Sequence, residues 1–128
     1  MSQNRMALLA VLALTLIASS CGGGNRLLSV QVLPQDPTIL NNNTVYTFPG
    51  GTVQYAIQGW YSNRTSQTVA SSSGKWSSTN TAIAGVDGNG LATSAGPLGV
   101  TTISVDVGGH KSSTVLAVCD PSTGLCPP

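Results

Sequence analysis

Few side chains in this 128-residue sequence could carry out a reaction. It has one histidine, His110, and its four acidic residues are all aspartates. A general base must lie near a nucleophile and be oriented by a third group, but His110 follows a Gly-Gly pair with no carboxylate at useful spacing. Ser72 and Lys75 match Ser-x-x-Lys, but the other motifs of serine acyl-transferring enzymes are missing. We therefore expect no catalytic residue, no cofactor and no enzyme activity.

Charge is scarce, and its scarcity excludes whole classes of partner. Only 7% of the residues are charged, against roughly 25% in an average globular chain. Five lysines and arginines cannot form the basic stripe that binds nucleic acid. The length is enough for one domain. The sequence thus predicts one folded domain that does not bind nucleic acid.

The first twenty residues have the pattern of an export signal. Arg5 precedes an apolar run, Met6–Ala18, that only Thr15 interrupts. A membrane-spanning helix needs about 20 apolar residues, so this run is too short and fits the core of a secretory signal. We expect a signal peptide over 1–20 that forms an N-terminal signal helix.

Cys21 directly follows the small residues Ala18-Ser19-Ser20, a pattern that resembles the lipobox of bacterial lipoproteins. The resemblance implies cleavage before Cys21, a diacylglycerol on its thiol and acylation of its amine. We expect a lipidated cysteine and Gly-rich tether over 21–27 that hold the protein at a membrane; plain secretion is the alternative. Lipoproteins that stay in the inner membrane have Asp directly after the lipidated cysteine. This chain has Gly22 at that position, so in a Gram-negative cell envelope the same resemblance favours the outer membrane.

Two cysteines remain, Cys119 and Cys126, close together near the C-terminus. Pro121 and Gly124 between them let the chain turn back, and an even number of cysteines in an oxidising compartment is typical of disulfides. Free or intermolecular thiols are one alternative. A zinc site is another, although two cysteines and one distant histidine do not provide four ligands. We expect a disulfide between Cys119 and Cys126 that closes a loop in the C-terminal tail, 120–128.

The rest of the chain has the pattern of short β-strands. Apolar and polar residues alternate in Leu28–Val32, Val53–Gln58 and Val100–Val107. Tight-turn dipeptides separate the runs, most clearly in Asp87-Gly88-Asn89-Gly90. This tetrapeptide also resembles the start of a calcium loop, but Leu98 stands where the bidentate glutamate is needed. We predict an all-β, antiparallel sandwich of about seven strands, with no metal site.

Several separated pieces resemble a bacterial immunoglobulin-like domain, group 2. They are Lys-Trp-Ser-Ser-Thr-Asn at 75–80, Ile-Ala-Gly-Val-Asp at 83–87, Gly-Leu-Ala-Thr at 90–93 and Gly-Val-Thr-Thr-Ile at 99–103. The resemblance implies an Ig-like β-sandwich over 28–119, used as an extracellular adhesion or spacer module, with Trp76 at its centre. The residues that we expect in the core are Trp76, Val86, Ile103 and Val105. Relative to the family, Asn41–Pro49 is interpreted as an insertion and Asn63–Gly74 as a long polar loop.

Trp60 and Tyr61 are the candidate ligand contacts. If Tyr55 and Ile57 point inward, alternation turns Trp60 outward beside Tyr61, where an aromatic pair could stack on a sugar or an apolar partner. Tyr46 and Phe48, in the segment interpreted as an insertion, are candidates of the same rank. We expect a membrane-anchored, non-enzymatic Ig-like lipoprotein for cell-envelope adhesion or protein interaction, whose partner is unknown. The alternative is a carbohydrate-binding surface module that uses Trp60 and Tyr61.

Overall fold

A computed structural model describes residues 25–36, 38, 40–41 and 43–126. The predicted signal helix and Cys21 lie outside these residues. The described elements, in chain order, are β1 (Leu27–Pro34), β2 (Leu40–Asn41), β3 (Thr44–Thr47), β4 (Thr52–Tyr61), β5 (Ser66–Val69), the 3₁₀ turn η3 (Ser71–Ser73), β6 (Lys75–Ser78), β7 (Ala84–Val86), β8 (Leu91–Ser94), β9 (Gly99–Val107) and β10 (His110–Val118).

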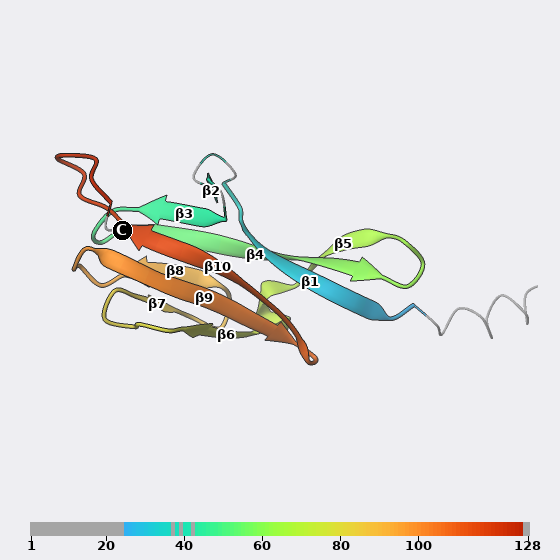
Figure 1. Cartoon of the computed structure of the whole chain (residues 1–128). Helices are drawn as coiled ribbons and strands as arrows, with labels where there is room; N and C mark the ends of the chain where they lie inside the picture. The colour runs from blue at the N-terminus through green and yellow to red at the C-terminus, as the bar shows by residue number, and fades with distance from the viewer. Residues whose placement is uncertain (1–24, 37, 39, 42, 127–128) are drawn as a thin grey trace, which may run out of the picture.

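The strands form two sheets that pack face to face (Figure 1). One has the order β1-β4-β8-β7, with β5 also paired to β4, and the other has the order β2-β3-β10-β9-β6. The order β1-β4-β8-β7 corresponds to the A-B-E-D sheet of the immunoglobulin fold, and β6-β9-β10 corresponds to C-F-G, with β3 and β2 added beside β10. The predicted all-β, Ig-like sandwich is therefore confirmed, although the described residues form ten strands where about seven were expected, and one pair, β3 with β10, is parallel.

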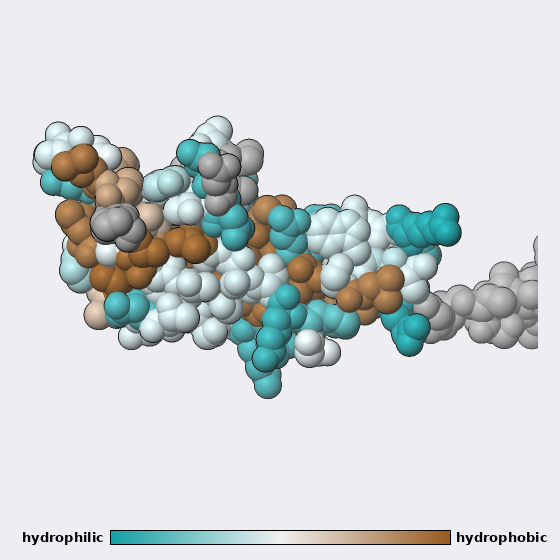
Figure 2. All heavy atoms as spheres, viewed as in Figure 1, coloured by the Kyte–Doolittle hydropathy of each residue, from teal (hydrophilic) through white to brown (hydrophobic). Residues whose placement is uncertain are grey.

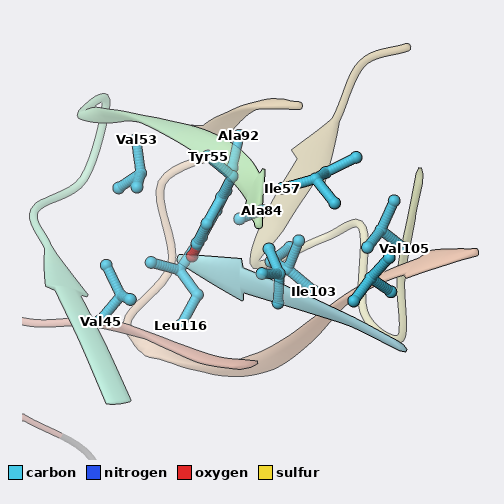
Figure 3. Close-up of a cluster of buried hydrophobic side chains, with 11 residues drawn as sticks. Val45, Val53, Tyr55, Ile57, Ala84, Ala92, Ile103, Val105 and Leu116 are labelled. Atoms are coloured by element: carbon cyan, nitrogen blue, oxygen red, sulfur yellow. The ribbon is translucent and has the colours of Figure 1, made fainter. Parts of the chain in front are cut away.

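Alternation along the long central strands builds the core between the sheets (Figure 3). In β4, Val53, Tyr55 and Ile57 are buried, while the residues between them are only half-buried. Every second residue of β9 from Thr101 to Val105 is likewise buried. Because successive strand side chains point to opposite faces, each strand supplies one wall of the core and one solvated face.

Two segments that the sequence analysis treated as irregular contain strands. Asn41–Pro49, interpreted as an insertion relative to the family, contains β3, which pairs in parallel with Val115–Val118 of β10. The predicted polar loop Asn63–Gly74 contains β5, which pairs with Ile57–Trp60. Both strands have four residues, so each offers too short a pattern for alternation to be recognised.

The sandwich has two distinct ends. The described chain begins beside β1 at the right of Figure 1, where Arg26 accepts a backbone bond from Ser62. At the opposite end lie the loops 48–51, 95–98 and 119–126, which we call the far end. Backbone hydrogen bonds hold these loops to each other and to the strands, from Cys119 N to Thr47 O at 2.8 Å and from Ser94 N to Gly51 O at 2.9 Å.

The described residues include no helix with the length and apolar character that a membrane span requires.

Candidate functional site

Of the four predicted core residues, two are fully buried and two pack against the core from a half-buried position. Ile103 and Val105 are fully buried, whereas Trp76 and Val86 are half-buried and pack against the core cluster. Trp76 lies on β6, with its ring centroid 6.1 Å from that of Tyr55. Its Nε1 donates a 2.8 Å hydrogen bond to the backbone oxygen of Ser71. The polar atom of the indole is therefore used within the fold.

The turn Asp87-Gly88-Asn89-Gly90 connects β7 to β8 and is stabilised by hydrogen bonds that involve side chains of the protein itself. The Asp87 carboxylate accepts 2.9 Å bonds from the backbone N–H groups of Asn89 and Leu91. The Gln54 side chain donates to the Asn89 carbonyl, also at 2.9 Å. Within the described ranges, no three His, Cys, Asp or Glu residues are grouped so that they could hold a metal ion.

Trp60 and Tyr61 do not form one aromatic platform. They are consecutive residues of β4, so their side chains leave opposite faces of the sheet. Trp60 is 39% exposed on the outer face. The Tyr61 ring lies on the inner side, near the space over Gly59 that Leu27 and Val69 also border. The structure thus separates the two rings that the sequence analysis paired.

Exposed apolar side chains instead gather at the far end, where Figure 2 shows brown surface at the left. Seven large hydrophobic residues are exposed among the described ones, and five of them lie in the far-end loops or in the adjoining ends of β3 and β9. We call them the far-end set: Tyr46, Phe48, Leu98, Val100 and Leu125. Sequence reasoning named Tyr46 and Phe48 as candidate ligand contacts but missed the set as a whole, because its members come from three separate segments.

Strand pairing brings part of the far-end set into one row. Tyr46 of β3 and Val100 of β9 are both paired with Ala117 of β10. Paired residues share a face of the sheet, so these three side chains lie side by side on the outer face. Ala117 is only 3% exposed between its neighbours. The row is therefore a continuous apolar strip.

A disulfide anchors the loop that carries Leu125. Cys119 and Cys126 are bonded with an S–S distance of 2.04 Å, which confirms the predicted bridge. Asp120 closes the loop, since its backbone N–H donates to Leu125 O at 2.9 Å and its carbonyl accepts from Gly124 N at 2.8 Å. Hydrogen bonds from Ser122 lower the pKa of the Asp120 carboxyl. The loop is therefore fixed by the disulfide and these hydrogen bonds, and it presents Leu125, which is 69% exposed, to solvent.

The charges of this sheet lie away from the far end. Asp106 of β9 is paired with Lys75 of β6 on one side and with Lys111 of β10 on the other. His110 pairs with Val107 beside them, at the β9–β10 turn. Between this charged row and the apolar row, the outer face carries Ser77, Ser104 and Ser113, and then Thr102, Val115 and Thr44. The outer face therefore changes from charged to apolar along its length.

Comparison with known proteins adds no relative. No protein-family model matches the chain, and no curated protein is significantly similar to it. A shared fold would not fix the function in any case, because one fold supports many functions. The function is therefore inferred from the surfaces of this chain.

Proposed function

We propose that the protein is a membrane-anchored, non-enzymatic Ig-like lipoprotein that presents its far end to a protein partner in the cell envelope. One observation carries the proposal: the chain enters the sandwich at one end, and the far-end set is exposed at the other. An anchored module of this kind can hold a contact surface away from the membrane.

The anchor is the lipidated Cys21 that the lipobox-like sequence implies. Gly22-Gly23-Gly24 follows it directly, and a flexible segment of about six residues reaches only about 12–15 Å. The ten residues of β4 span roughly 33 Å. The N-terminal end of the sandwich would then stay close to the membrane, with the far end beyond it.

The charge balance favours contact through apolar surface. Downstream of Cys21, the four aspartates face an equal number of basic residues, Arg26, Arg64, Lys75 and Lys111. Such a neutral module has little long-range field with which to attract a charged partner. Clustered apolar side chains on a soluble domain commonly mark a protein contact site. The far-end set is the strongest such cluster among the described residues.

Photo-crosslinking in intact cells tests the proposal. A benzoylphenylalanine residue would replace Leu98 or Leu125 at the far end and, as a matched control, Thr68, which is exposed on β5. We expect a discrete protein adduct from both far-end positions and none from Thr68. Adducts from Thr68 alone, or from no position, would contradict the proposal. Protease accessibility in the same cells would show which side of the membrane the domain faces.

Carbohydrate binding at Trp60 and Tyr61 is less well supported. That alternative needs both rings on one surface, but they leave opposite faces of β4. Trp60 alone, beside Ser29 and Ser66 on the neighbouring strands, offers a single ring.

A further inference from the structure

A groove opens where the chain passes from β1 toward β2 and from β3 into β4. Its lining includes Gln35, Asp36, Tyr46, Phe48, Thr52 and Gln54. From these side chains we infer that the groove is a binding site for a neutral carbohydrate. This inference goes beyond the proposed function and does not depend on the anchor; the groove shares Tyr46 and Phe48 with the far-end set, but its ligand and its test are separate.

Two aromatic rings supply the apolar part of the site. Tyr46 is 37% exposed and Phe48 is 54% exposed. Both residues border the groove, Tyr46 from β3 and Phe48 from the segment that follows it. Aromatic faces pack against flat apolar surfaces, and the C–H face of a pyranose ring is such a surface.

Gln54 supplies a fixed hydrogen-bond acceptor. Its Nε2 donates to the carbonyl oxygens of Tyr55 at 3.0 Å and Asn89 at 2.9 Å, which hold the amide in one orientation. Its Oε1 has no hydrogen-bond partner among the described residues, and an amide oxygen can accept two bonds. The Gln54 backbone oxygen accepts from Gln35 N at 2.9 Å, so a second glutamine lies beside the first.

Asp36 supplies a carboxylate that is ionised at neutral pH. The hydroxyl and backbone N–H of Thr38 both donate to Oδ1 and lower the pKa of this carboxyl. Oδ2 accepts no hydrogen bond from the described residues and can take one from a ligand hydroxyl. Ligand sites commonly combine apolar walls with a few placed polar groups of this kind.

The lining also selects among ligand classes. Its described residues include no Lys, Arg or His, so Asp36 would repel a phosphate, a sulfate or a carboxylate. A purely apolar ligand would leave Gln54, Gln35 and Asp36 desolvated without partners, which is unfavourable. A neutral ligand rich in hydroxyls satisfies both the rings and the acceptors.

Isothermal titration calorimetry on the full-length chain tests the site, in a detergent without a sugar headgroup. The probes are maltohexaose, cellohexaose, xylohexaose, chitohexaose and, as the anionic arm, a heparin hexasaccharide. We expect at least one neutral hexasaccharide to bind. Phe48→Ala should weaken that binding at least tenfold, and Phe48→Tyr should restore it. Trp60→Ala, a matched aromatic deletion outside the groove, should change it less than twofold.

Gln35→Ala, which removes an exposed side chain, provides a second test if Phe48→Ala fails to fold by circular dichroism, and it too should weaken binding. Three results would overturn the inference: no neutral probe binds at millimolar concentration, only the heparin fragment binds, or binding survives both groove variants. Binding of an apolar peptide in place of every sugar would also overturn it. None of these outcomes bears on the crosslinking test of the proposed function.

Discussion

The indole of Trp76 lies so close to Gly90 that a Cβ atom at position 90 would come within 2.7 Å of its Cζ2 atom. Gly90 also has φ of +78°, a conformation that L-residues with side chains rarely adopt. Its carbonyl accepts a 2.9 Å bond from Tyr55 N. One glycine therefore joins the β7–β8 turn, strand β4 and the tryptophan of β6.

Gly90→Ala should destabilise the fold by about 2–4 kcal/mol, because left-handed strain costs about 1–2 kcal/mol and overpacking against the indole adds to it. Gly88→Ala is the matched control, since a Cβ there meets no atom within 4 Å, and it should change stability by less than about 0.5 kcal/mol. Urea unfolding measures both. Equal midpoints for the two variants would contradict this packing.

Thr101→Val tests a buried hydroxyl network. Thr101 is 2% exposed, and its Oγ1 lies 2.8 Å from Ser78 Oγ and accepts a 3.0 Å bond from Asn80 N. The valine leaves these groups without their partner, at a cost of about 1–3 kcal/mol. Thr102→Val, whose hydroxyl makes no hydrogen bond with the described residues, should have little effect. Thermal unfolding that ranks the two variants in the opposite order would refute the network.

Tyr55→Phe should raise stability by about 1 kcal/mol, because the fully buried Tyr55 hydroxyl has no hydrogen-bond partner among the described residues and such a group is costly. Burial also raises the pKa of Tyr55 well above its usual value. Above about pH 10 the unfolded phenol ionises while the folded one stays protonated, so wild-type stability falls as pH rises.

In Tyr55→Phe, the free energy of unfolding should no longer include the decrease caused by ionisation of the unfolded Tyr55 phenol. This decrease amounts to about 1.4 kcal/mol per pH unit above about pH 10. Tyr46→Phe, which leaves Tyr55 in place, is the control and should keep it. Unfolding free energies measured from pH 8 to pH 12 make the comparison. A decline of the same slope in wild type and Tyr55→Phe would show that Tyr55 is not the group responsible.

Removal of the disulfide with Cys119→Ser and Cys126→Ser should lower the free energy of unfolding by about 2.5 kcal/mol, the chain-entropy value for so short a loop. Urea unfolding of the exported protein measures this loss. Mass spectrometry of unreduced, alkylated protein provides the control: we expect no label on Cys119 or Cys126 before reduction. Two labelled cysteines in unreduced protein would contradict the bridge.

The sequence predicted those features that depend on local pattern. Alternation located the buried faces of β4 and β9, and the spacing of Cys119 and Cys126 indicated the bridge that the structure contains. The same alternation also implies that the Tyr61 side chain points inward when that of Trp60 points outward. The proposed aromatic pair of Trp60 and Tyr61 could therefore have been rejected from the sequence.

Other features depend on pairing between distant segments. β3 has four residues and pairs in parallel with β10, more than sixty residues later. No local period marks such a strand, because its stability comes from its partner. The far-end set and the groove beside Phe48 exist only once β3 is in place, and so neither could be located from the sequence.

Metabolic labelling with palmitate tests the central claim most directly, because the proposed module must be lipidated at Cys21. We expect label in the wild-type protein and in a variant that lacks both Cys119 and Cys126, and no label in Cys21→Ala, which should also leave the membrane fraction. Label that persists in Cys21→Ala, or is absent from the wild-type protein, would contradict the lipid anchor.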